Sequence, residues 1–362
     1  MARVAGRRPD MLTLGKVTAD RRAGVYKYFR GDHTAKHAAK GSRARKHQNR
    51  GDYYMDEKGT VAEAKTMWWG KGAAALGLEG KAVSGRAFGH LLDGQDPRVK
   101  RERDPETGKL SYTPTQLVKA GGNGEHTLAI EAMFAPSKSV SILWAVGDTG
   151  TRRAIQDAHD RAVRYALGHM ESRLKPMRRV VGEGKDRTWL YEETRGLTVA
   201  IFGHNTSRPT AACNCPDPQI HSHCLVMNAA LRTTPDKAGR TWGAIDDITF
   251  RRARAEMGAV YRTHVAHTLQ GQGYAIEREG EYTHVVGIKP EIMAAMSKRT
   301  QEVAETAKVF EAEHGRAPTA IESAQLAMQN RQNKTPLEVG IFAQWAEQLA
   351  PHGVTAKTPE QL

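Results

Sequence analysis

The chain has too few cysteines for a disulfide scaffold and no apolar segment long enough to cross a membrane. Its 362 residues include only three cysteines, Cys213, Cys215 and Cys224, so we expect a reducing, cytoplasmic compartment. No run approaches the roughly 18 apolar residues of a spanning helix, so we expect no membrane insertion. Residues 1–10 are basic but no apolar core follows them, so we do not expect a secretory signal.

Acidic residues are outnumbered by basic ones, and a phosphate-binding loop of the ATPase type is missing. Lys and Arg number 54 against 40 Asp and Glu, which gives a formal net charge of +14 and an isoelectric point of about 9.7. This excess favours a polyanionic partner, above all nucleic acid, although a basic protein without such a partner has the same composition. No Gly-x-x-x-x-Gly-Lys-Ser/Thr motif is present, so we do not expect ATP hydrolysis.

Segments typical of strands and of helices do not alternate strictly along the chain. Apolar periodicity predicts strands at residues 126–135, 197–204 and 219–231. Apolar residues at helical spacing predict two long helices, over residues 151–174 and 250–270, and a mostly helical part from residue 290 onward. This order favours an α+β fold with an antiparallel sheet over a doubly wound parallel sheet.

The segment Ile-His-Ser-His-Cys-Leu-Val-Met-Asn, which starts at Ile220, carries the strongest chemical signal. In a strand, His221 and His223 point to the same face, about 6 to 7 Å apart, whereas Cys224 points to the other face. The preceding strand ends at His204, and an antiparallel return of the chain brings this ring beside the pair. Three imidazoles with an open coordination position suit a metal ion that also binds substrate.

Other interpretations of these residues stay open. His-x-His pairs occur by chance in a chain with 15 histidines, and the three cysteines are an alternative ligand set for a structural zinc. The spacing of Cys213 and Cys215 is unusual for zinc ligands, which argues against that alternative. Imidazoles favour Zn or Mn over Mg, but phosphate oxygens and waters make Mg possible. We therefore expect one divalent metal ion, Mg, Mn or Zn.

Tyrosines cluster around a basic segment near the start of the chain. Tyr26 and Tyr28 precede this segment, and Tyr53 and Tyr54 follow it. Residues 30–50 contain seven Lys and Arg against one acid, which predicts an exposed arm that either contacts phosphates or is simply solvated. Tyrosine rings are usually half-buried in a core. Four of them beside a basic arm also suit nucleophilic attack on a phosphate.

The order of these motifs resembles the N-terminal domain of MobF-class conjugative relaxases, the TrwC/TraI type. The likeness runs from about residue 11 to about residue 308. It rests on an early Tyr, Phe-Ala-Pro-Ser-Lys-Ser-Val-Ser at 134–141, His-Asn-Thr-Ser-Arg at 204–208 and Asp-Pro-Gln-Ile-His-Ser-His at 217–223. The resemblance implies a metal-dependent transesterase that nicks one strand of a plasmid origin of transfer. Implied partners are single-stranded origin DNA, relaxosome accessory proteins and the conjugative secretion machinery.

The resemblance also implies a fold and a division of the chain. We expect a central antiparallel palm sheet flanked by helices, with a C-terminal helical fingers subdomain. Residues 1–10 would be a basic extension, 11–288 the palm with a basic insertion at 31–51, and 289–362 the fingers and tail. If the protein continues into the helicase that is usual in this family, that part lies outside this sequence.

Individual roles follow from the same resemblance. His204, His221 and His223 match the metal-binding histidines of the family. Glu131 stands where the family has an Asp beside these histidines, and a carboxylate there either orients an imidazole or takes a proton.

The tyrosines match the nucleophiles of the family. Tyr26 matches the first nucleophile, with Tyr28 as its alternative, and Tyr53 or Tyr54 matches the second tyrosine group. Attack by the first phenol on the scissile phosphate would release a 3′-hydroxyl and leave a 5′-phosphotyrosine.

Candidate DNA contacts near this chemistry are Lys138, Arg208 and Arg299, which would contribute salt-dependent affinity. Aromatic candidates for base stacking are Trp68, Trp69 and Tyr112, although core packing is the more usual role of a tryptophan.

Two other functional classes stay open. A rolling-circle replication initiator uses related chemistry, but such initiators tend to place the tyrosine after the paired histidines, whereas Tyr26 precedes them. A non-catalytic, basic DNA-binding protein with a structural metal is the other alternative.

Overall fold

The computed structural model describes residues 12–30, 66–98, 100–103, 107–108, 110–118, 126–213, 215–280, 282–329, 332 and 340–354. Within these ranges, five strands form the central sheet in the order β1-β5-β10-β9-β2, and every neighbouring pair is antiparallel. The strands are β1 (Leu12–Thr18), β2 (Thr66–Trp69), β5 (Thr127–Phe134), β9 (Val199–Thr206) and β10 (Pro218–Met227). The predicted α+β fold with an antiparallel sheet is thus confirmed.

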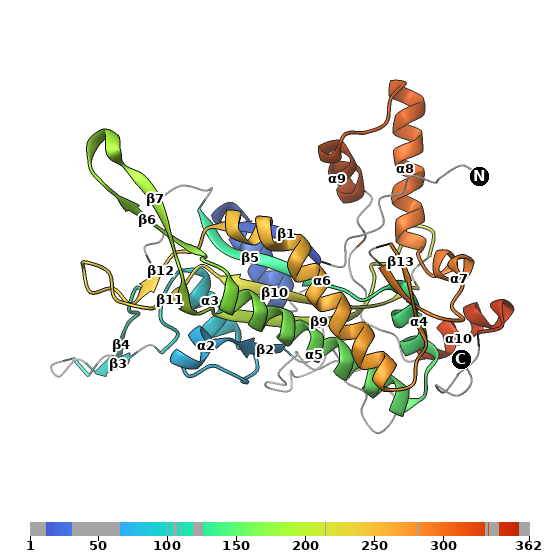
Figure 1. Cartoon of the computed structure of the whole chain (residues 1–362), viewed down its shortest axis with the longest axis horizontal. Coiled ribbons are helices and arrows are strands. Elements are labelled where there is room, and N and C mark those ends of the chain that lie inside the picture. Colours follow the sequence, from blue (N-terminus) through green and yellow to red (C-terminus); the bar gives the residue numbers. More distant parts are fainter. Residues whose placement is uncertain are drawn as a thin grey trace.

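Two long helices cover one face of this sheet (Figure 1). They are α5 (Thr149–Arg173) and α6 (Asp247–Gly271). Each begins at an aspartate whose carboxylate accepts a hydrogen bond from a first-turn backbone N–H, at Asp148 and Asp246. Their apolar faces pack on Ile130, Phe134 and Val226 in one buried cluster, so the apolar periodicity of both helices is explained by burial against the sheet.

Shorter helices cover the opposite face. These are α1 (Arg22–Arg30), preceded by η1 (Ala19–Arg21), α2 (Lys71–Ala75) and α3 (Gly85–Leu92). They pack with Phe202, Leu225 and Met227 in a second buried cluster. Because both faces of β10 are covered, its residues from Ile220 to Met227 are all buried, which accounts for the apolar run Cys224–Met227 at its end.

The C-terminal part is helical, as predicted. It contains α7 (Pro290–Ala295), α8 (Lys298–His314), α9 (Ala320–Gln329), α10 (Ile341–Leu349) and η4 (Ala350–His352). Figure 1 shows α8 and α9 projecting away from the sheet, whereas α10 lies beside α4 (Lys138–Val146). Trp345 of α10 is fully buried in the same cluster as the sheet residues, and its Nε1 donates a hydrogen bond to the carbonyl of Pro216 at 2.8 Å.

Hairpins and a small sheet complete the described structure. The hairpins are β3–β4 (Lys100–Arg103 and Leu110–Thr113), β6–β7 (Met177–Val181 and Thr188–Glu192, with η3 at Gly184–Asp186 between them) and β13–β14 (Ile276–Glu279 and Tyr282–Val285). The small sheet has the order β12-β11-β8 (Trp242–Gly243, Ala230–Arg232 and Thr194–Gly196). Among the described helices, none has the length and apolar character needed to span a bilayer.

Candidate active site

The three histidines lie together on the sheet face that α1 and α3 cover. His204 on β9 is directly opposite His221 on β10 in the antiparallel register, and His223 follows two residues later on the same face. Their ring centroids are 5.3 Å apart for His204–His221, 5.2 Å for His204–His223 and 5.1 Å for His221–His223. The fold therefore brings the three imidazoles into one compact group, as the i, i+2 spacing and the antiparallel return require.

The spacing of the rings suits a single shared ion. Imidazoles that bind a tetrahedral metal through one nitrogen at about 2.1 Å have ring centroids about 5.2 Å apart. In the stretches that the structure describes, no group of three or more His, Cys, Asp or Glu side chains has its donor atoms already gathered as in a loaded metal site. We therefore expect the rings to turn slightly when an ion binds.

Hydrogen bonds orient two of the rings. Nδ1 of His223 lies 2.5 Å from Oε1 of Glu131, and Nδ1 of His221 lies 2.9 Å from the carbonyl oxygen of Gln219. Because a carbonyl oxygen and a carboxylate accept hydrogen bonds, Nδ1 is the donor in both rings. The lone pair of each neutral ring is then on Nε2, the atom available to a metal, and this is the usual arrangement of a metal-binding histidine.

Glu131 has room for its longer side chain because a glycine lies across from it. Gly15 on β1 is paired with Glu131 on β5, and a Cβ atom added to Gly15 would lie 3.3 Å from Oε2 of Glu131. The glycine therefore leaves space beside the carboxylate that orients His223.

Replacing Glu131 by Gln is expected to weaken binding of Mn²⁺ or Zn²⁺ by roughly 10- to 100-fold. The amide keeps the size of the side chain but loses the negative charge that makes the imidazole more basic. Isothermal titration calorimetry measures the change, and Glu256→Gln on the exposed side of α6 is the matched control. Equal affinity in Glu131→Gln and the control would show that the carboxylate does not support the metal site.

A buried polar network supports β10 from behind. Ser222 lies between the two histidines in sequence but points to the opposite face, where its Oγ lies 2.8 Å from Nε2 of His159 on α5. Nδ1 of His159 lies 2.7 Å from the hydroxyl of Tyr261 on α6. The three side chains are almost completely buried, so they fix β10 to both covering helices. This network could not be predicted from the sequence because its members are far apart along the chain.

Burial lowers the pKa of His159 to about 4. An unfolded chain takes up this proton near pH 6.5, whereas the folded chain takes it up only near pH 4. The free energy of unfolding should therefore fall as the pH decreases between these values, by about 2 kcal/mol at pH 5.

Urea denaturation at pH 7 and pH 5 measures this loss, with His159→Gln as the comparison. The variant is expected to lose about 2 kcal/mol less than the wild type over this interval, because it lacks the titrating group. The same loss in both proteins would contradict a neutral, buried His159.

Tyr26 lies on the inner side of α1, against α3. Its ring is parallel to that of Phe88, with a centroid distance of 6.2 Å, and a Cβ added to Gly89 would lie 3.2 Å from it. One turn later, the ring of Phe29 lies 5.5 Å from His223 and 6.3 Å from Phe88. A continuous row of aromatic contacts thus connects the Tyr26 position to the histidines, and among the described side chains of α1, Phe29 contacts His223.

The other candidate nucleophiles are less fully described. Tyr28 belongs to α1, but its side chain lies outside the described part of the structure. Tyr53 and Tyr54, the basic arm at 31–51 and the extension at 1–10 all lie outside the described residues. Their predicted roles stay predictions.

The basic candidates already have structural contacts. Nζ of Lys138 donates to the carbonyl of Pro218 at 2.9 Å, and burial lowers the pKa of this amine to about 8. Arg299 forms an ion pair with Glu302 within α8. Arg208, just after β9, donates to the carbonyl of Gln332 at 3.1 Å. Direct DNA contact by any of the three would occur beside, or in place of, these bonds.

Burial decides two further predictions: base stacking by Trp68 and a zinc site formed by the three cysteines. Trp68 is fully buried in the cluster under α3, so it does not stack on DNA bases. Trp69 packs against the other cluster, and the side chain of Tyr112 is not among those described. Cys224 is buried on the sheet face opposite the histidines. It lies six residues along the extended strand β10, about 20 Å from Pro218, whereas Cys213 and Cys215 precede that strand, which excludes a zinc held by all three.

One exposed element, the β6–β7 hairpin, was not predicted from the sequence. Trp189 and Leu190 are exposed on it, and the guanidinium of Arg178 lies 4.3 Å from the centre of the Trp189 ring. Figure 1 shows this ribbon extending far from the sheet. Its sequence signal is the alternation of Trp189 and Tyr191, which lie opposite Val180 and Arg178 and are typical of an exposed two-stranded ribbon.

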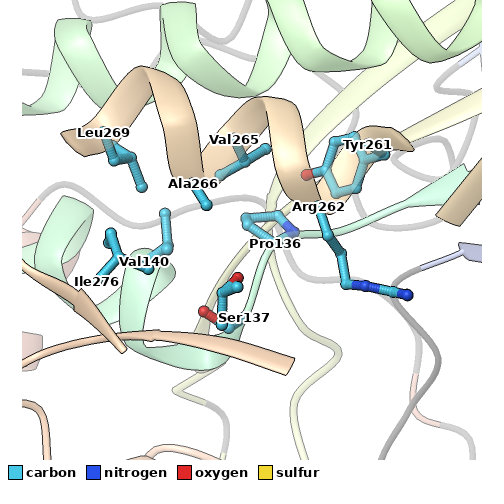
Figure 2. Close-up of a pocket in the computed structure, with 10 residues that line it drawn as sticks. Pro136, Ser137, Val140, Tyr261, Arg262, Val265, Ala266, Leu269 and Ile276 are labelled. Atoms are coloured by element: carbon cyan, nitrogen blue, oxygen red, sulfur yellow. The ribbon is translucent and has the colours of Figure 1, made fainter. Parts of the chain in front are cut away.

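A small cavity beside Tyr261 is too small for substrate. It lies between α6 and the start of α4, with Pro136, Ser137 and Val140 on one side and Val265 on the other (Figure 2). Its volume is about 10 Å³, which admits at most a water molecule. This cavity therefore leaves no room for a substrate inside the helix–sheet core.

Comparisons with known proteins identify a family and a matching fold. The family model described as "TrwC relaxase" matches residues 22–352, and a comparison with curated protein sequences gives no match. Among solved structures, the metal-free conjugative relaxase TrwC in complex with oriT DNA is 24% identical, with a TM-score of 0.67. A copper-bound complex of TrwC with oriT DNA is 24% identical, with a TM-score of 0.68.

A third complex, of TrwC with a 27-mer DNA comprising the recognition hairpin and the cleavage site, is 23% identical, with a TM-score of 0.65. Each comparison covers 95% of this chain and 99% of the other, so the likeness extends over the entire fold. Because the family model matches most of the sequence, the chain belongs to the TrwC relaxase family.

Proposed function

We propose that this relaxase nicks and rejoins one strand of an origin of transfer by metal-dependent transesterification to a tyrosine. The observation that carries the proposal is the group of three imidazoles on β9 and β10, with centroids 5.1 to 5.3 Å apart, beside the tyrosine-bearing helix α1. Phe29 of α1 contacts His223 directly, so this helix presents its C-terminal turn to the histidines. The TrwC structures named for oriT DNA and for a bound metal support the same activity.

His204, His221 and His223 would hold one divalent ion, and Glu131 would keep His223 in the neutral tautomer that binds it. When bound, such an ion neutralises charge on the non-bridging oxygens of the scissile phosphate. Mg, Mn and Zn all remain compatible with this donor set, because phosphate oxygens and waters complete it.

A tyrosine on α1 supplies the nucleophile, with Tyr26 as our first choice and Tyr28 as the alternative. A free phenol has a pKa near 10, so only about one in a thousand is ionised at pH 7. The site must therefore favour loss of the phenolic proton during attack. The phenol oxygen bonds to phosphorus, the bond from phosphorus to the 3′ oxygen breaks, and that oxygen leaves as the 3′-hydroxyl. The 5′-phosphotyrosine conserves the phosphodiester, so the reverse step rejoins the strand.

We place the reaction in the cytoplasm, on single-stranded origin DNA, with relaxosome proteins and the secretion machinery as further partners. The palm (11–288) would carry the chemistry and the helical fingers (289–362) would cover the DNA. Tyr53 or Tyr54 would serve a second transfer.

Incubation with supercoiled plasmid that carries the origin tests the activity. We expect open circles with protein attached to the nicked strand, formed with Mn²⁺ or Mg²⁺ and suppressed by a chelator. Open circles without attached protein would indicate a hydrolytic nuclease, and unchanged supercoils with normal DNA affinity would indicate a non-catalytic binding protein.

A further inference from the structure

A second candidate site lies away from the histidines, between α2 and the small sheet. It is an open cavity of about 540 Å³ whose wall includes β11, the strand that follows β10. By contrast, His221 and His223 lie near the middle of β10, and His204 lies on β9. The described residues that line it include three cationic side chains and no acidic one: Lys71, Ala75, Arg98, Arg195, Leu231, Thr241 and Trp242. The volume lies in the range of pockets that hold a nucleotide-sized ligand.

Two of the cations are exposed and available. Lys71 begins α2, Arg195 is the middle residue of β8, and both side chains are exposed. In the part of the chain that the structure describes, neither side chain forms an ion pair. Arg98 is different, because its guanidinium is held by Asp96 at 2.6 Å and donates to the carbonyl of Ala75 at 3.0 Å. Among the described side chains, the pocket thus has two cations without an ion-pair partner and one arginine fixed at its edge.

The fold holds the backbone segments that carry Lys71 and Arg195 close to each other. A Cβ added to Gly196 would lie 2.4 Å from the backbone nitrogen of Gly72 and 2.6 Å from Cβ of Lys71, so only glycine permits this approach of β8 and α2. The buried carboxylate of Glu171 accepts hydrogen bonds from the backbone N–H of Lys71 at 2.9 Å and of Leu197 at 2.8 Å. Lys71 and the residue after Gly196 are therefore fixed to one buried group.

Like charges held together without an acid repel each other, and a bound anion relieves that repulsion. The remaining wall offers apolar surface and a hydroxyl, because Trp242 pairs with Leu231 across the small sheet and Thr241 precedes it. This combination suits a phosphate group with a sugar or base attached to it better than it suits an isolated small anion.

The surroundings of the pocket favour a long polyanion over a free nucleotide. Arg98 lies just before the β3–β4 hairpin, and Arg195 lies just after the β6–β7 hairpin that carries Arg178 and Trp189. Both hairpins extend from the same end of the molecule as the small sheet (Figure 1). A backbone phosphate in the pocket would therefore continue into DNA that lies along these ribbons.

We propose that the pocket formed by Lys71, Arg98 and Arg195 is a phosphate-binding subsite for the DNA backbone, separate from the histidine site. The inference rests on the proposed action of the chain on DNA. The subsite anchors the strand at a distance from the cleavage point, so that DNA stays attached through non-covalent contacts when the strand is cut.

The test is a fluorescence anisotropy titration of a labelled 30-nucleotide single strand of mixed sequence, with Lys71→Gln/Arg195→Gln as the variant. The dissociation constant is expected to rise at least about tenfold at 0.1 M salt, and the slope of log K against log salt to fall by about 1.4, as for two lost phosphate contacts. Arg153→Gln/Arg161→Gln, on the exposed side of α5, removes the same charge away from the pocket and is expected to change the constant less than about threefold.

Lys71→Arg/Arg195→Lys keeps both charges and is expected to bind like the wild type, which separates lost charge from lost structure. An affinity in Lys71→Gln/Arg195→Gln no weaker than in the α5 control would overturn the proposal. A second result would also overturn the proposal: inorganic pyrophosphate stabilises the wild type, but Lys71→Gln/Arg195→Gln binds DNA with unchanged affinity. The pocket would then hold a small anion and not the DNA backbone.

The titration requires neither metal nor cleavage, so its result is independent of the proposed chemistry. Absence of nicking by the wild type would contradict the transesterase and leave the pocket measurement valid. Normal nicking with unchanged affinity in the pocket variant would contradict the pocket alone.

Discussion

Alanine at His221 or His223 is expected to lower the rate of strand cleavage at least about a thousandfold, equivalent to roughly 4 kcal/mol of lost transition-state stabilisation. Either change removes one of three imidazoles whose rings converge within 5.3 Å, and two ligands hold a divalent ion far less firmly. Because the histidines lie at the site of chemistry, and phosphate contacts elsewhere supply most of the affinity for DNA, we expect oligonucleotide affinity to change less than about threefold.

Single-turnover cleavage of a labelled origin oligonucleotide measures the rate, and anisotropy measures the affinity on the same protein. His267→Ala, on an exposed position of α6, is the matched control and should cleave normally. Loss of DNA affinity in parallel with loss of cleavage would show that the histidines serve folding. Cleavage that is unchanged in His221→Ala and His223→Ala would contradict a metal held by the triad.

Removing a single phenolic oxygen from α1 is expected to abolish the covalent protein–DNA adduct. Tyr26→Phe keeps the ring that stacks on Phe88, so the packing of α1 on α3 should survive and the free energy of unfolding should change little. If Tyr26 is the nucleophile, its variant forms no adduct, because no other group at that position can attack phosphorus.

Tyr28→Phe tested in parallel decides between the two candidates, and Tyr165→Phe, at an exposed position of α5, is the control. Loss of the adduct in Tyr28→Phe with normal activity in Tyr26→Phe would move the nucleophile two residues along the helix. Full activity in both variants would remove α1 from the mechanism.

Much of the central sheet could be predicted from sequence because its strands and helices are long and periodic. β5, α5 and α6 each show enough turns or alternations for burial on one side to be evident. The β2 strand was missed because it has only four residues, Thr66–Trp69, and its conformation depends on pairing with β9. The β6–β7 hairpin was missed for a related reason, since it packs on little else and has weak apolar periodicity.

The histidine group was within reach of sequence reasoning because strand geometry alone sets it. Spacing of i, i+2 places His221 and His223 on one face, and a single antiparallel return adds His204. The supporting contacts were not predictable in the same way. Pairing of Gly15 with Glu131, and of Ser222 with His159, depends on register and on helix placement between segments many residues apart.

The structure shows that Trp68 is a core residue, which the sequence alone could not establish. A tryptophan that stacks on bases and a core tryptophan look alike in sequence, and only the burial of Trp68 in one cluster with residues of α3 shows that this ring is inside. The pocket around Lys71 could not be predicted from the sequence either. Lys71 and Arg195 are more than a hundred residues apart along the chain, and the contact of α2 with β8 at Gly196 brings their backbone segments together.

Mass spectrometry of the trapped adduct tests the central claim most directly. Trypsin cuts after Arg22, Lys27 and Arg30, so Tyr26 lies in the peptide Ala-Gly-Val-Tyr-Lys and Tyr28 in the peptide Tyr-Phe-Arg. After reaction with origin DNA, Mn²⁺ and nuclease trimming, a 5′-phosphonucleotide is expected on the peptide with Tyr26, or on the peptide with Tyr28 if that residue is the nucleophile. It should be absent when His221 is replaced by alanine. DNA cleaved without a nucleotide on either peptide would contradict attack by α1 at the histidine site.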